Sequence, residues 1–230
     1  MQITIYQGRK SPPISADITI VIDVIRAFTV AHYAFINGAS CIFLAETTKQ
    51  AFQLKEEKPD YLLAGEEDGL AIEGFDLDNS PYKVSKENLF RKTLIQKTTN
   101  GVRATLNCLQ SKHLFVTGFT NARNTAEFIK KKLVDGRKKT IHIIASHPSG
   151  DDDLACAEYI KAILEDSNAV SSQKAIERIR HSHVADKFFD MENDAFASVD
   201  VDYCLRELHS DFVMKINKTC KIPMIERVYK

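Results

Sequence analysis

The chain has 230 residues, of which 44% are hydrophobic, and this is enough to bury a substantial core. Basic and acidic residues both number 31, so the net charge is zero and the basic excess typical of nucleic-acid binders is missing. Five widely spaced cysteines without a C-x-x-C motif argue against a disulfide framework and a structural zinc site. We therefore expect a reduced, cytoplasmic protein that binds no nucleic acid.

Short β-branched runs alternate with amphipathic segments along the chain. Strands are predicted at Ile3–Tyr6, Ile18–Asp23, Cys41–Ala45, Tyr61–Ala64, Thr93–Lys97, Leu114–Thr117 and Thr140–Ala145. Apolar stripes at helical spacing predict helices at Asn121–Val134, Asp153–Leu164 and Asp200–Phe212. This alternation predicts a single α/β domain over residues 1–230, with a mostly parallel sheet in a three-layer α/β/α arrangement. The apolar run 18–25 is too short to span a bilayer, so no membrane association is expected.

Two connections differ from the rest of the chain. Gly65–Tyr82 contains three glycines, one proline and six carboxylates. A connection of this length within a compact domain is usually functional or disordered. Residues 166–194 are polar and weakly patterned, and we expect them to form a peripheral helix pair.

The residues that follow the predicted strands suggest where chemistry could occur, because ligands of open parallel sheets bind outside the carboxyl ends of the strands. Five groups follow strands: Asp23 with Arg26, Gly65–Gly69, Thr98–Gly101, Gly118–Asn121 and Ser146–Asp153. Carboxylates, hydroxyls, amides and glycines would therefore gather at one edge of the sheet.

This mixture favours phosphoryl chemistry on a small anionic substrate. Carboxylate oxygens are the hard ligands that Mg²⁺ prefers, and Mg²⁺ often binds through a few carboxylates plus substrate phosphate. Thr98–Gly101 offers hydroxyls and backbone N–H groups at a strand-to-helix turn, where anions bind readily. Arg26 offers a bidentate fork for phosphate or sulfonate.

Each of these features also has a purely structural interpretation. Asp23 could cap the following helix, and Thr98–Gly101 could be only a turn. The acidic run 151–153 is favourable at a helix N-terminus without any metal. Among the histidines, only His147 follows a predicted strand, and we retain it alone as a site candidate.

Familiar phosphatase and nucleotide motifs are missing from the sequence. It contains no G-x-x-x-x-G-K-[ST], no G-x-G-x-x-G and no G-x-S-x-G. Asp23 is not followed two residues later by a second aspartate, and no cysteine is followed six residues later by arginine. A metal-assisted mechanism without a common nucleophile motif is what remains.

Five blocks of sequence resemble the 2-phosphosulfolactate phosphatase family in order and approximate spacing. They are Val21–Ala27, Gly65-Glu66, Gly74–Pro81, Thr98–Gly101 and Gly118–Asn121, and Gly150–Ala157 resembles the family's next block. The blocks cover roughly residues 18 to 160. The resemblance implies a three-layer α/β/α fold and Mg²⁺-dependent hydrolysis of 2-phospho-3-sulfolactate to 3-sulfolactate and phosphate. That reaction serves coenzyme M synthesis in methanogens and sulfolactate formation in some bacteria.

The resemblance and the strand-end residues together assign the site. Asp23, Arg26 and Glu66 are the predicted catalytic residues, and Asp23, Glu66, Asp152 and Asp153 are the predicted Mg²⁺ ligands. The predicted substrate-binding residues are Arg26, Asn79, Ser80, Thr99, Asn100, Gly101 and Asn121. We expect Arg26→Ala to lower activity steeply and to leave thermal stability nearly unchanged.

Three positions depart from the family pattern and keep other functions open. Glu67 stands where an arginine is usual, Asp78 where a glycine is usual, and Val102 where a threonine is usual. One alternative is a non-catalytic binding protein for a small anionic metabolite. Another is a phosphatase of similar mechanism for a different phosphorylated hydroxy acid. A homodimer is compatible with the sequence.

Overall fold

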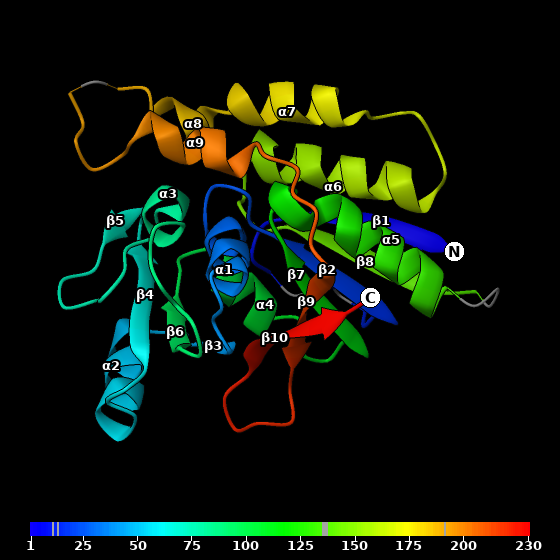
Figure 1. Cartoon of the computed structure of the whole chain (residues 1–230). Helices are drawn as coiled ribbons and strands as arrows, with labels where there is room; N and C mark the ends of the chain where they lie inside the picture. Colours follow the sequence, from blue (N-terminus) through cyan, green and yellow to red (C-terminus); the bar gives the residue numbers. More distant parts are fainter. Residues whose placement is uncertain (11, 13, 135–137, 191) are drawn as a thin grey trace.

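Figure 1 shows the computed structural model, which describes residues 1–10, 12, 14–134, 138–190 and 192–230. The strands are β1 Gln2–Gln7, β2 Ile18–Ile22, β3 Cys41–Leu44, β4 Leu62–Glu67, β5 Leu70–Ala71, β6 Thr93–Lys97, β7 His113–Thr117, β8 Thr140–Ala145, β9 Phe212–Asn217 and β10 Met224–Tyr229. The helices are α1 Ala27–Ile36, α2 Thr48–Glu57, α3 Pro81–Val84, α4 Gly101–Leu106, α5 Ala122–Leu133, α6 Asp151–Leu164, α7 Ser172–Arg180, α8 His183–Asp186 and α9 Ser198–Cys204, with a 3₁₀ turn η1 at Phe119–Asn121.

The strands of the described chain form one ten-stranded sheet in the order β1-β8-β2-β7-β9-β10-β3-β6-β4-β5. Strands β1, β8, β2 and β7 form one parallel block, and β3, β6 and β4 form a second. The antiparallel hairpin β9–β10 joins the two blocks, and the short β5 pairs antiparallel with β4. The predicted mostly parallel sheet is confirmed.

Strand β2 shows why its sequence is a continuous apolar run. Ile18, Ile20 and Ile22 pack into the cluster that contains α5 and α6, whereas Val21 packs into the cluster that contains α1. Both faces of the strand are therefore covered, as in α/β/α proteins. The predicted α/β/α fold is confirmed.

Helix α1 lies between the two parallel blocks. All of its residues from Ala27 to Phe35 are buried, and its core cluster includes Val116 of the first block and Ile42 and Leu94 of the second. Helix α2 covers the other face of the second block through Ala51. The sheet therefore curves around α1, as Figure 1 shows.

This curvature brings together the carboxyl ends of strands from both blocks. Three antiparallel pairings separate β7 from β3, so the two blocks run in opposite directions along the sheet. In a flat sheet their carboxyl ends would lie at opposite edges. Here the Gly101 N–H, after β6, donates to Asp23 Oδ2, after β2, over 2.8 Å. The strand ends therefore meet at one place.

The predicted elements agree with the structure at all seven strands and at α5 and α6, and α7 and α8 lie in the expected peripheral segment. The predicted helix Asp200–Phe212 is wrong beyond Cys204. The Leu208 N–H donates to Thr120 O, and Phe212 begins β9 and pairs with Tyr229. The apolar stripe continued past the helix because the strand buries the same residue types.

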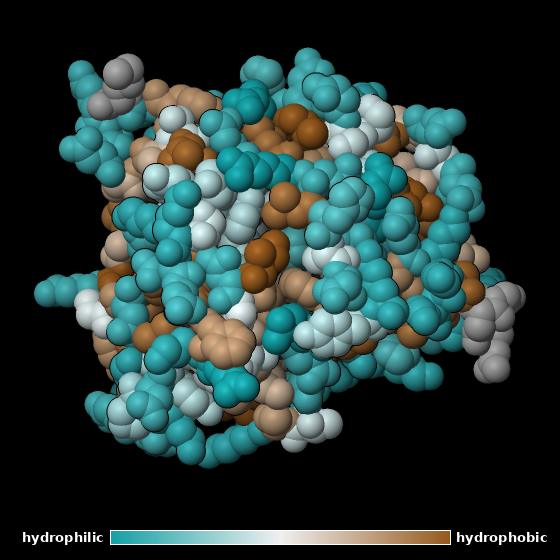
Figure 2. Space-filling model, in the orientation of Figure 1, coloured by the Kyte–Doolittle hydropathy of each residue, from teal (hydrophilic) through white to brown (hydrophobic). Residues whose placement is uncertain are grey.

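The outer surface shown in Figure 2 is largely hydrophilic, and its hydrophobic residues appear singly or in small groups. No helix in the described part of the chain is long and apolar enough to cross a membrane.

Candidate active site

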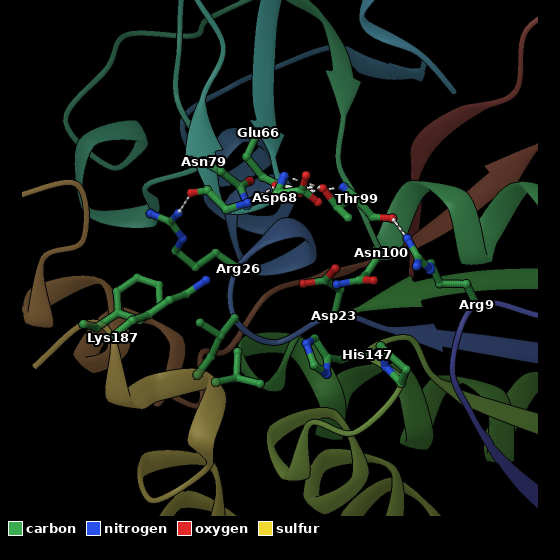
Figure 3. Close-up of a pocket in the computed structure, with 15 residues that line it drawn as sticks. Arg9, Asp23, Arg26, Glu66, Asp68, Asn79, Thr99, Asn100, His147 and Lys187 are labelled. Carbon is green, nitrogen blue, oxygen red and sulfur yellow. Dashed lines mark hydrogen bonds between the residues drawn. The ribbon is translucent and has the colours of Figure 1, made fainter. Parts of the chain in front are cut away.

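A cavity of about 320 Å³ opens where the carboxyl ends of the strands meet, as Figure 3 shows. Six predicted site residues line it: Asp23, Arg26, Glu66, Asn79, Thr99 and Asn100. The predicted candidate His147 also lines it. The wall further includes Arg9, Asp68 and Lys187, which sequence reasoning did not assign. Strand-end logic therefore located the cavity but not all of its charged groups.

Asp23 lies in the middle of the cavity and is 6% exposed. Its Oδ1 accepts from the Ala27 N–H at 2.9 Å, which is the predicted helix-capping contact, and its Oδ2 accepts from the Gly101 N–H. Burial, followed by the charges of Asp153 and Glu66, raises the pKa of Asp23 to about 8. Asp23 therefore holds two elements together and also presents a poorly solvated carboxyl group to the cavity.

Asp152 and Asp153 lie in the first turn of α6 and are each 1% exposed. Asp153 accepts from the backbone N–H groups of Val24 and His147 at 2.7 and 2.9 Å, so it mainly fastens α6 to the strand ends. Asp152 accepts from Ser182 Oγ at 3.4 Å. Burial, followed by Asp23, raises the pKa of Asp152 to about 7, and burial, followed by Asp152, raises that of Asp153.

Glu66 connects the loop after β4 with the loop after β6. Its Oε2 accepts from the Gly69 N–H and from Thr99 Oγ1, and its Oε1 accepts from the Thr99 N–H. The carboxylate therefore has three protein donors. Its role in this structure is to shape the cavity wall, and binding a metal would require it to exchange some of these donors.

Arg26 is held by a buried carboxylate that sequence reasoning missed. Its Nη1 donates to Asp200 Oδ2 at 2.8 Å, and its Nη2 donates to Gly69 O at 2.9 Å. The guanidinium also lies 4.9 Å from the ring centroid of Phe188 and 5.6 Å from that of Phe196. The expectation that Arg26→Ala would leave stability nearly unchanged therefore needs correction, because Arg26 belongs to a buried ion pair.

Asn79 and Ser80 belong to the block Gly74–Pro81, which resembles the family, and they have different roles. Asn79 is 4% exposed and lines the cavity, and no protein group bonds to its buried Oδ1 among the described residues. Ser80 caps α3 and donates to Asp200, and it does not line the cavity. Asn79 therefore remains a candidate ligand-binding group, whereas Ser80 supports the Arg26–Asp200 pair.

The backbone N–H groups of Thr99 and Gly101, which the sequence predicts as an anion-binding site, already donate to carboxylates of the protein. The Thr99 N–H donates to Glu66 and the Gly101 N–H donates to Asp23, so neither amide is free for an anion in this structure. A side chain on Gly101 would place Cβ 2.6 Å from Asp23 Oδ2, and this close approach explains the glycine. Of the three residues, Thr99 and Asn100 line the cavity.

Asn121, a predicted substrate-binding residue, lies outside the cavity lining. It is 1% exposed, its Oδ1 accepts from Thr117 Oγ1 at 2.9 Å, and its Nδ2 donates to Thr125 Oγ1 at 3.4 Å. Its amide fastens the turn after β7 to the start of α5. These contacts are structural, and a role for Asn121 in substrate binding stays a prediction.

The two departures from the family pattern at Glu67 and Asp78 also lie outside this lining. Glu67 pairs with Lys97 at 3.0 Å, and its side chain is 61% exposed. Asp78 pairs with Lys83 at 2.6 Å and accepts from the Ser80 N–H. Neither substitution changes the charge on the wall of the main cavity.

His147 reaches the cavity from the loop after β8. Its Nδ1 accepts from the Ser149 N–H at 3.2 Å, so in the neutral ring the proton lies on Nε2. Burial, followed by the nearby His183, lowers the pKa of His147. The ring is therefore neutral near pH 7 and carries one donor.

The fit of Mg²⁺ to this site rests on its buried carboxylates. Asp23 raises the cost of ionising Asp152, which is buried behind the cavity lining, and no basic side chain pairs with either carboxylate among the described residues. No group of three or more His, Cys, Asp or Glu residues in the described chain is arranged to hold a metal by itself. Mg²⁺ commonly binds one or two carboxylates and completes its shell with water and substrate phosphate, so the donor set fits that mode.

Comparisons with known proteins agree with the resemblance. The model of the family described as 2-phosphosulpholactate phosphatase matches residues 5–219. A protein of Bacillus subtilis named "Probable 2-phosphosulfolactate phosphatase" is 58% identical over 228 residues, 99% of each chain. Proteins of the same name from Caldicellulosiruptor saccharolyticus and Clostridium beijerinckii are 41% identical over 143 residues (61% of this chain, 59% of the relative) and 29% identical over 215 residues (85% and 87%).

Proposed function

Because the chain belongs to the 2-phosphosulfolactate phosphatase family and is a phosphoric monoester hydrolase, we propose that it hydrolyses 2-phospho-3-sulfolactate to 3-sulfolactate and phosphate, with Mg²⁺ as cofactor. The observation that carries this proposal is the position of Asp23 in the middle of a small cavity whose walls hold Arg9, Arg26 and Lys187. A small ester with several negative charges matches that arrangement.

Asp23 and Asp152 are the residues that would hold Mg²⁺, and both Asp23 and Glu66 would have to share or exchange their present protein donors to bind it. When bound, Mg²⁺ supplies positive charge to the phosphoryl oxygens and relieves the repulsion between the two buried carboxylates. Two of the four carboxylates predicted from the sequence as Mg²⁺ ligands, Asp23 and Asp152, are thus proposed to bind the metal directly. Asp153 remains the residue that positions α6.

The chain's own groups would then bind and orient the ester. Arg26 and Asn79 face the phosphoryl group, and the ion pair with Asp200 keeps the Arg26 guanidinium in place. The Nε2–H of His147 would donate toward the leaving oxygen. Phe188 and Val184 supply apolar groups to the cavity lining.

The test is phosphate release from 2-phospho-3-sulfolactate by the purified chain. We expect turnover with Mg²⁺, loss of turnover in EDTA and recovery when Mg²⁺ is restored. Asp23→Asn should reduce kcat by at least about 100-fold, because the metal would lose a carboxylate ligand next to the phosphoryl group. Turnover that is equal with and without EDTA would contradict the proposed Mg²⁺ dependence. If no phosphate is released with Mg²⁺, the proposed reaction is wrong.

A different phosphorylated hydroxy acid is the alternative substrate within the same chemistry. A comparison of kcat/KM across such esters separates the two. Binding of sulfolactate without turnover of the phosphorylated form would instead identify a non-catalytic protein. Glu67 and Asp78, the departures from the family pattern that motivate this alternative, lie outside the main cavity lining.

A further inference from the structure

The cavity has a cationic group at each end. Figure 3 shows Arg9 on one side and Lys187 on the other, with Asp23 between them. Arg26 also lies near Lys187, but its charge is balanced by Asp200. Among the residues that the structure describes, no carboxylate lies within ion-pair distance of Arg9 or Lys187. These two charges are therefore available to a ligand.

The Lys187 ammonium lies beside two aromatic rings. Its Nζ lies 4.4 Å from the ring centroid of Phe196 and 5.7 Å from that of Phe188. A Cβ on Gly69, which has φ +87°, would lie 2.8 Å from this Nζ. The side chain is half-buried, and burial, followed by Arg26, lowers the pKa of Lys187. A partly desolvated ammonium of this kind gains most from an anionic partner.

Arg9 reaches the opposite end from the loop after β1. Its Nη1 donates to Thr99 O at 3.3 Å, and its backbone carbonyl accepts from Asn107 Nδ2 at 2.8 Å. One bond to a carbonyl leaves most of the five guanidinium donors for another acceptor. A planar fork of this type matches a planar carboxylate.

We propose that Lys187 and Arg9 select the substrate by the two acid groups that flank its phosphate, with Lys187 binding the sulfonate and Arg9 the carboxylate. This inference rests on the proposed function. In 2-phospho-3-sulfolactate the phosphate is on the central carbon, with the carboxylate on one side and the sulfonomethyl group on the other. A phosphate above Asp23 directs these two acids toward the two cationic ends. We assign the carboxylate to the guanidinium, whose planar fork matches a planar carboxylate, and the sulfonate to the ammonium at the other end.

The experiment compares kcat/KM for three phosphate esters. They are 2-phospho-3-sulfolactate, 2-phospholactate, which lacks the sulfonate, and the phosphate ester of isethionate, which lacks the carboxylate. Lys187→Gln should lower kcat/KM for the first ester by roughly 10- to 100-fold, the range for a hydrogen bond between charged groups, and should leave 2-phospholactate within about twofold. Arg9→Gln should do the same for the first ester and spare the isethionate ester.

Lys187→Arg keeps the charge and should restore most of the preference for the sulfonated ester, a rescue that a merely structural role would not produce. Lys174→Gln removes an exposed lysine of α7 outside the cavity lining and serves as the matched control. Equal losses on all three esters in the Gln variants would overturn the inference alone. A wild-type chain that releases no phosphate from 2-phospho-3-sulfolactate would overturn the proposed function with it.

Discussion

The buried ion pair between Arg26 and Asp200 leads to an asymmetric prediction about stability. The side chains are 7% and 2% exposed, and Asp200 also accepts from Ser80 Oγ and from the Tyr82 N–H. Asp200→Ala leaves a guanidinium buried without its counter-ion, and arginine cannot release its proton to escape that cost. Arg26→Met leaves Asp200 unpaired, but a carboxyl group can take up a proton and keep its bond to Ser80.

The expected magnitudes follow from this difference. Removing one member of a buried pair costs about 3–5 kcal/mol, and we expect Asp200→Ala to lie in that range. For a chain of this size, such a loss corresponds to a decrease in Tm of about 6–20 °C. We expect Arg26→Met to cost less, because methionine keeps contact with Phe188 and the remaining carboxyl can become neutral. The double variant should be more stable than the sum of the single losses predicts.

Urea denaturation of the two single variants and the double variant, at pH 7 and without ligand, measures these free energies. Activity under the proposed reaction should fall in Asp200→Ala as well, because Arg26 loses the contact that orients it. Equal losses in the two single variants together with strict additivity would refute the reasoning. So would a loss below about 1 kcal/mol in Asp200→Ala, since that is the scale of an exposed pair.

Three further results are expected. Burial, Asp153 and other neighbours raise the pKa of Asp23 from 3.8 to about 8, so the folded chain holds a proton that the unfolded chain releases in this range. Without metal, the free energy of unfolding should therefore fall by up to about 1.4 kcal/mol per pH unit as pH rises from about 4 to 8, and Tm should fall with it. A calorimetric dependence of Tm on pH that is the same in Asp23→Asn would contradict this. Gly65→Ala should destabilise the chain by roughly 1–3 kcal/mol from backbone strain, because φ is +140°, and by more from the clash of the added Cβ, which would lie 1.9 Å from Lys97 O; an unchanged urea midpoint would exclude this. Asn121→Ala should cost about 1–3 kcal/mol and leave kcat/KM nearly unchanged, and a large rise in KM would return this residue to the substrate site.

Local patterns were sufficient for seven of the strands, for α5 and α6, and for the position of the cavity, but not for the hairpin β9–β10. The apolar run at Ile18–Ile22 predicts a strand covered on both faces, and Asp23 directly after it is placed at a carboxyl end by chain connectivity alone. Thr99 and Asn100 follow β6 for the same reason and do line the cavity. Asn121 shows the limit of this logic, because following a strand does not decide whether a side chain points into the cavity or fastens the next helix.

The partners of the charged groups depend on contacts between distant parts of the chain. Arg26 and Asp200 are separated by 174 positions, and nothing near Asp200 in the sequence distinguishes its carboxylate from an ordinary helix residue. Lys187 lies in a polar, weakly patterned segment that was expected to be peripheral, and Arg9 precedes the first recognised block.

The sequence by itself therefore determined the alternation of strands and helices and the chemistry at the strand ends, because both depend on neighbouring residues. The tertiary structure decided that the sheet curves around α1, so that the ends of two oppositely directed blocks meet at Asp23 and Gly101. The tertiary structure also decided which basic side chains are paired with a carboxylate and which remain available to a ligand. Arg26, the arginine that sequence reasoning selected for the substrate, is paired with Asp200, and the cavity presents Arg9 and Lys187 to a ligand.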